Sequence, residues 1–101
     1  MTILSGIGGV ISAAHKSPCG VIHGHTWEVV TWWRNDAHFV DAGDRRARVD
    51  AFLKQLDHTI LPDTLMWGEQ LAEHIGVHLK CYAVDISRKP ERIYARWERG
   101  E

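Results

Sequence analysis

Apolar and β-branched residues dominate two stretches in the first third of the chain. Residues 6–14 are rich in Ile, Val, Ser and Gly, and a segment so short and glycine-rich is predicted to be a strand rather than a helix. Residues 25–33, with the sequence HTWEVVTWW, combine the β-branched and aromatic side chains that favour strands. Between them, the segment KSPCG contains a proline and a glycine and is predicted to be a loop.

The middle of the chain has the three-to-four-residue apolar spacing of amphipathic helices. Asp44 is expected to cap the start of the first helix. The buried face of that helix is predicted to contain Val49, Phe52, Leu53 and Leu56. Pro62 ends this segment, and a second helix is expected from about Leu65 to Leu79. Its inward residues are Leu71, Ala72, Ile75 and Leu79.

The end of the chain is predicted to form a second pair of strands. The segments CYAVDIS and RIYARWE, residues 81–87 and 92–98, flank the turn RKPE. The order is therefore ββααββ, in one domain over residues 1–101. We expect an α+β fold in which two helices cover one face of a four-stranded antiparallel sheet.

Two adjacent tryptophans indicate that the other face of the sheet is covered by another subunit. Trp32 and Trp33 follow each other in one predicted strand, so they point to opposite faces. One of them must therefore lie outside the helix-covered core. Oligomerisation would cover such a face and close the free edges of the sheet. The alternative is an exposed tryptophan without functional meaning.

Composition and charge narrow the class of protein. A net charge of −1 without a basic block argues against a nucleic-acid or membrane surface. The apolar start, MTILSGIGGVISAA, lacks a basic region and contains three glycines, which disfavours a signal peptide. It is also shorter than the roughly 20 residues of a membrane helix. We expect a cytoplasmic protein with Cys19 and Cys81 as free thiols; a secreted protein with a disulfide is the alternative.

Histidine is unusually frequent, with seven residues in 101. His15 ends the first predicted strand, and His23 and His25 begin the second, so a hairpin would bring three imidazoles together. Three neutral imidazoles suit zinc and leave a fourth position open, as in catalytic zinc sites. Cys19 could instead close the site as a fourth ligand. The other alternative is a hairpin with three surface histidines and no metal.

The loop thiol of Cys19 is a candidate nucleophile or base above this cluster. Its activation needs a partner that takes the proton. His58, next to Asp57 at the end of the first predicted helix, is a candidate for that partner. A histidine at this position also interacts favourably with the helix dipole, which is a sufficient alternative explanation. Sequence spacing alone does not show that Cys19 and His58 meet.

The motifs SAAH, CGVIHGH, LDHTIL and GEQLAEHI, followed by a strand with an internal acid, resemble the 6-pyruvoyl-tetrahydropterin synthase family. The resemblance covers about residues 11–97. The spacing Cys-x-x-x-His-Gly-His resembles the bacterial branch that makes 6-carboxytetrahydropterin for 7-deazaguanine and queuosine synthesis. The resemblance implies the T-fold, whose sheets join into a trimeric barrel that stacks as a hexamer, with active sites between subunits.

The resemblance also implies the site residues. The zinc ligands would be His15, His23 and His25, and the catalytic triad would be Cys19, Asp57 and His58. Glu69 matches the acid of the second-helix motif, and Asp85 falls where the family carries a glutamate that binds the guanidine-like edge of the pterin.

The implied reaction converts 7,8-dihydroneopterin triphosphate to 6-carboxytetrahydropterin, acetaldehyde and triphosphate. Elimination of triphosphate to a pyruvoyl product is the alternative reaction. The chain departs from the family pattern at Pro62, Met66, Trp67 and Asp85. These departures leave open a changed substrate, or a zinc-binding protein without catalytic activity.

Overall fold

The computed structural model describes residues 3–16, 20–35, 42–65 and 67–100. Its elements are β1 (Ile3–Lys16), β2 (Ile22–Asn35), α1 (Ala42–Leu56), α2 (Gly68–Leu79), β3 (Ala83–Arg88) and β4 (Ile93–Glu98), with 3-10 turns at Asp63–Leu65 and Lys89–Glu91. The strands form one antiparallel sheet in the order β1-β2-β3-β4. This confirms the predicted ββααββ architecture. In the described part of the chain, no helix has the length and apolar character needed to cross a membrane.

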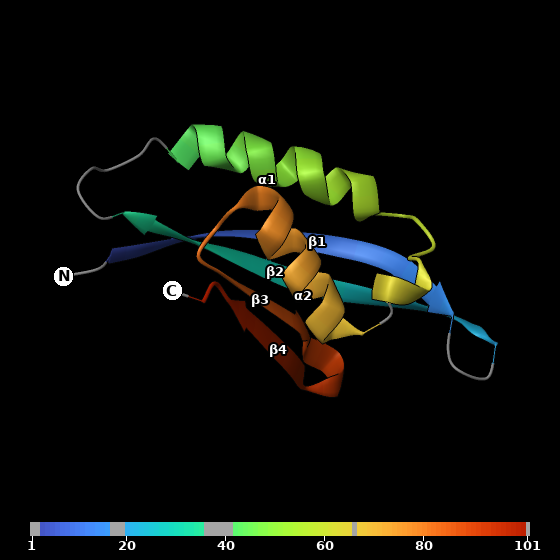
Figure 1. Ribbon diagram of the computed structural model, residues 1–101. Helices are drawn as coiled ribbons and strands as arrows, with labels where there is room; N and C mark the ends of the chain where they lie inside the picture. The colour runs from blue at the N-terminus through green and yellow to red at the C-terminus, as the bar shows by residue number, and fades with distance from the viewer. Residues whose placement is uncertain (1–2, 17–19, 36–41, 66, 101) are drawn as a thin grey trace.

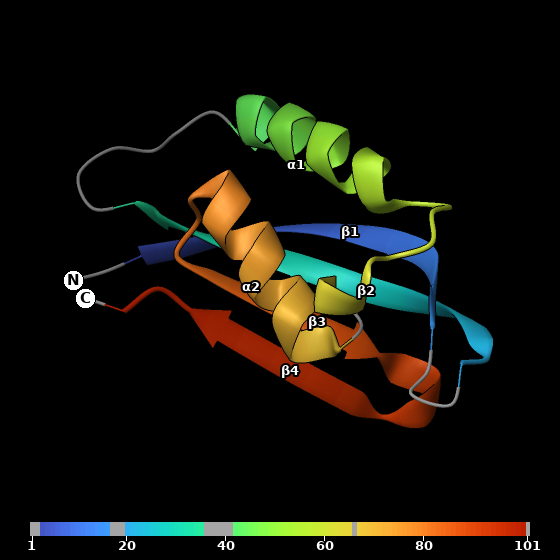
Figure 2. The same ribbon diagram turned by 45° about the vertical axis from the view of Figure 1, so that its right-hand side comes forward.

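Both helices lie on the same face of the sheet, as Figures 1 and 2 show. α1 packs on β1, and α2 packs on β3 and β4. The alternation of the strands places apolar side chains beneath the helices. The fully buried side chains of this core include Ile11, Val29, Val49, Leu71, Ile75, Val84 and Ile86. Cys81 is also buried there as a free thiol, and burial raises its pKa.

The adjacent tryptophans point to opposite faces, as predicted. Trp33 is buried on the helix-covered side, with the guanidinium carbons of Arg45 and Arg48 each 5.2 Å from its ring centroid. Trp32 lies on the bare face, where its indole N–H donates to Asp85 Oδ2 at 2.8 Å. The bare face therefore carries a half-buried tryptophan that hydrogen bonds within the chain.

The first two strands are longer than predicted. β1 and β2 each contain 14 residues and pair continuously from Ile3 with Asn35 to Lys16 with Ile22. The predicted ranges, 6–14 and 25–33, covered only the most apolar part of each strand. Backbone pairing extends further because each hydrogen-bonded pair supports the next, whatever the polarity of the side chains.

The predicted starts of the two helices are wrong by a few residues. α1 begins at Ala42, so Asp44 lies in its first turn and is not the N-cap. An acid there still interacts favourably with the helix dipole. α2 begins at Gly68 and not at Leu65, because Asp63–Leu65 form a separate 3-10 turn after Pro62. Leu65 is buried by that turn. It therefore fits the apolar spacing of the following helix without belonging to it.

The packing of α2 on β4 can be tested at Gly76. A Cβ at Gly76 would lie 2.2 Å from ring atoms of Trp97. Gly76→Ala is expected to lower the free energy of unfolding by about 1–2 kcal/mol, because an overpacking cost of about 2–3 kcal/mol exceeds the gain of about 1 kcal/mol from helix propensity. Chemical denaturation measures the change. Val77→Ala, at an exposed position of the same helix, is the matched control and should change stability by about 0.5 kcal/mol or less. An unchanged or raised stability of Gly76→Ala would contradict the close packing.

Candidate functional site

Three histidines gather at the hairpin end of the helix-covered face. His15 pairs with His23 and Ala13 with His25 across the β1–β2 ladder, so all three imidazoles lie on the face where Trp27 is buried. The ring centroids of His15 and His25 are 4.7 Å apart. The ring centroid of His23 lies 6.1 Å from that of His15 and 6.2 Å from that of His25. The hairpin thus brings together the three imidazoles that were predicted to converge.

The surroundings of His15 and His25 favour neutral imidazoles. Burial lowers the pKa of both side chains, and the nearby charges of Arg88 and of the other histidines lower it further. Both ring nitrogens of His15 are buried, and neither has a hydrogen-bond partner in the described part of the chain. A neutral imidazole with an unpaired nitrogen is the form that binds a metal ion.

The three rings do not surround a single point as they lie. The planes of His23 and His25 are 12° apart, and the ring of His15 is tilted by 37° and 34° to them. Within the described residues, no three His, Cys, Asp or Glu side chains are arranged to hold a metal ion. The centroid spacing of His15 and His25 is nevertheless close to the roughly 5 Å that tetrahedral zinc coordination implies, whereas His23 lies about 1 Å farther from both. Metal binding here would therefore require rotation of side chains.

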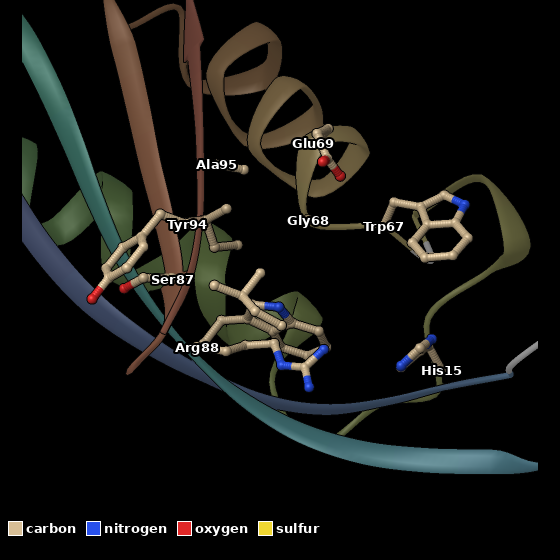
Figure 3. A pocket seen from close by; sticks show the side chains of 11 residues that line it. His15, Trp67, Gly68, Glu69, Ser87, Arg88, Tyr94 and Ala95 are labelled. Atoms are coloured by element: carbon tan, nitrogen blue, oxygen red, sulfur yellow. The ribbon is translucent and has the colours of Figure 1, made fainter. Parts of the chain in front are cut away.

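A cavity of about 280 Å³ lies beside His15, next to the N-terminal end of α2 (Figure 3). Glu69 on α2 and Arg88 at the end of β3 bring charged side chains to its wall. Its apolar lining consists of Trp27, Trp67, Ile86, Ile93 and Ala95. The fold therefore places Glu69, a predicted substrate-binding residue, at the same cavity as His15.

The segment after α1 runs along the outer edge of β1. The backbone N–H of His58 donates to the carbonyl of Ser12 at 2.6 Å, and that of Ala14 donates to Thr59 at 2.9 Å. The N–H of Ser12 donates to Asp57 Oδ1 at 2.7 Å. These bonds pair part of the free edge of β1 and fix the position of the Asp57 carboxylate.

Asp57 and His58 form a hydrogen-bonded pair. His58 Nδ1 lies 2.8 Å from Asp57 Oδ2, and the imidazole is 82% exposed. The hydrogen bonds from Ser12 and His58 lower the pKa of Asp57, so this carboxylate is ionised at neutral pH and accepts from Nδ1–H. The outer nitrogen of His58 is then free to take a proton. His58 and His25 line one open cavity, whereas Cys19, the third predicted member, lies outside the described residues.

Asp85 lies on the opposite face of the sheet from the cavity. It accepts hydrogen bonds from Trp32 Nε1 at 2.8 Å and from Arg96 Nη1 at 2.9 and 2.8 Å. Its neighbour Ile86 points to the other face of β3 and lines the cavity. The chain by itself therefore does not bring Asp85 to Glu69 and the histidines, and its predicted contact with a pterin stays a prediction.

Arg88 is a cavity residue that the sequence analysis did not identify. It follows Ile86 by two positions in β3, and strand alternation puts both on the same face. This alternation was the sequence signal that could have placed Arg88 on the helix-covered face. The presence of a cavity above this face depends on where α2 begins, which the sequence pattern placed too early.

Comparison with known proteins agrees with this architecture. Residues 10–98 match the family model described as 6-pyruvoyl tetrahydropterin synthase. The chain belongs to this family. No curated protein matches it in sequence. Among solved structures it is similar to the 6-pyruvoyl tetrahydropterin synthase of Caenorhabditis elegans, with a TM-score of 0.83 and 17% identity over 99% of this chain and 97% of that chain. At this identity the likeness shows the fold, which confirms the predicted T-fold.

Proposed function

We propose that the protein is a zinc-dependent lyase that converts 7,8-dihydroneopterin triphosphate and one water molecule to 6-carboxy-5,6,7,8-tetrahydropterin, acetaldehyde and triphosphate, a step of 7-deazaguanine and queuosine synthesis. The observation that carries this proposal is the histidine cluster beside a cavity that Glu69 also lines. Family membership supports a pterin substrate. The spacing Cys-x-x-x-His-Gly-His supports the carboxy product. Elimination of triphosphate to a pyruvoyl product is the second candidate, because the matched family and the solved structure carry that name.

The metal would be held by His15, His23 and His25. Their close spacing, the neutral forms of His15 and His25, and the unpaired ring nitrogens of His15 fit zinc. Three protein ligands would leave one position for a substrate oxygen. When bound, zinc would supply Lewis-acid polarisation of a substrate hydroxyl.

Proton transfer is assigned to the predicted triad. Cys19 would take a proton from the substrate side chain in its thiolate form. Asp57 holds Nδ1–H of His58, so the outer nitrogen of this imidazole would return protons on the other side. Asp85 and Glu69 are the proposed pterin contacts, since a carboxylate can accept hydrogen bonds from both the amino group and the ring N–H.

The fold leaves surfaces that a homotrimer, or a hexamer of two trimers, would cover. The outer edge of β4 is unpaired in the described chain, and Val10 and Tyr94 on the bare face are 57% and 68% exposed. We place the active sites between these subunits. Sedimentation velocity at micromolar concentration should give about three or six times the chain mass of 11.5 kDa. A species of 11.5 kDa would contradict this assembly.

The reaction is tested with zinc-loaded protein and 7,8-dihydroneopterin triphosphate. We expect equal amounts of acetaldehyde and triphosphate, and one zinc ion per chain in protein purified without a chelator. His23→Ala should lose both zinc and products, because two imidazoles bind the ion more weakly than three. Triphosphate without acetaldehyde would indicate the pyruvoyl product. Zinc without either product would indicate a zinc-binding homologue without this activity.

Conservative substitutions test the two predicted pterin contacts, Glu69 and Asp85, one at a time. Glu69→Gln should raise KM for the pterin about 10-fold or more, since a hydrogen bond to a charged group is worth about 1.5–3 kcal/mol. Asp85→Asn should also raise KM, and the loss of its bonds to Trp32 and Arg96 should lower the melting temperature as well. A lowered melting temperature with unchanged KM would contradict the pterin contact of Asp85 and leave this carboxylate a structural role.

A further inference from the structure

Arg88 is a half-buried cation in the wall of the cavity. It is the last residue of β3, its side chain is 23% exposed, and it lines the cavity together with His15 and Glu69 (Figure 3). One terminal nitrogen donates to Glu91 Oε1 at 3.2 Å. The Nε–H group is buried and has no hydrogen-bond partner in the described part of the chain. A buried N–H without a partner costs free energy, so a ligand that accepts from it would be favoured.

The turn after β3 holds the Arg88 guanidinium in place. Lys89–Glu91 form a 3-10 turn that brings the Glu91 carboxylate back to Arg88. This carboxylate is 45% exposed, so it fixes one edge of the guanidinium while solvent screens much of its charge. The remaining donors of the planar group stay available, and a guanidinium binds phosphate oxygens through two such donors at once.

The charged side chains of the cavity wall differ in sign and come from different elements. Glu69 belongs to α2 and Arg88 to β3, and no ion pair joins them among the described residues. A ligand with hydrogen-bond donors at one end and anionic oxygens at the other would satisfy both. A pterin triphosphate has this polarity, with its amino edge and its phosphates at opposite ends.

We propose that Arg88 binds a phosphate group of the triphosphate side chain and thereby selects the phosphorylated pterin over the unphosphorylated one. The identity of the ligand rests on the proposed function. The anion site itself rests on the placement of Arg88. Because the phosphates leave as one group, a residue that holds them binds substrate and the released triphosphate alike.

The probe for this site is inorganic triphosphate, titrated calorimetrically into equally zinc-loaded proteins. Arg88→Ala should weaken its binding about 10- to 100-fold, the range for lost hydrogen bonds to a charged group. Arg88→Lys should keep part of the affinity, because the charge remains and the fork of donors is lost. Arg46→Ala, which removes an arginine on the exposed surface of α1, is the matched control and should stay within twofold. If Arg88→Ala does not fold, Arg88→Gln replaces it.

Turnover gives the second measurement. Arg88→Ala should raise KM for the triphosphate substrate by a similar factor. It should leave the inhibition constant of dihydroneopterin, which lacks the leaving group and can only compete for the pterin site, as in the wild type. Product formation with unchanged triphosphate affinity and KM in Arg88→Ala would overturn the Arg88 proposal and leave the lyase intact. Arg88-dependent triphosphate binding without any product would support the anion site and contradict the proposed reaction. Wild-type protein that does not bind triphosphate would also overturn the site.

Discussion

The register of the β1–β2 ladder is the constraint on which the candidate site depends. Pairing of His15 with His23 places these imidazoles, and that of His25, on the helix-covered face. A slip of one residue would turn one strand's side chains to the other face and separate the histidines. The register is held by buried side chains such as Trp27 and Val29, because exposing each would cost about 1.5–3 kcal/mol or more.

Asp57 connects the stability of the fold to the orientation of the proposed proton carrier. One carboxylate oxygen pairs the N–H of Ser12 at the edge of β1, and the other bonds to His58. Because these bonds lower the pKa of Asp57, their stabilising effect is present above the unfolded value of 3.8 and is lost as the pH falls through the lower folded value. The carboxylate is therefore ionised at neutral pH.

Most of the fold could be predicted because alternation and helical spacing report which face is buried. The start of α2 could not, since Leu65 is buried equally well by a 3-10 turn. The alternation of side chains in β3 also predicts the face on which Asp85 lies. Its neighbours Val84 and Ile86 are apolar and buried beneath the helices, so Asp85 must point to the other face. Its position in the motif implies a pterin contact, which stays a prediction. Arg88 is the converse case, since its face was predictable but its cavity arises only from the placement of α2 above it.

The polar groups of the two sheet faces differ in how they are satisfied. On the bare face Asp85 binds both Arg96 and Trp32, so this polar network is complete within the chain and contributes to a defined packing. At the cavity, the ring nitrogens of His15 and the Nε–H of Arg88 lack partners in the described chain. Each such buried group reduces stability by about 1–3 kcal/mol. Folding alone gains nothing from this arrangement, whereas a metal ion and an anionic ligand would satisfy both groups, which is the physical reason to locate the function at this cavity.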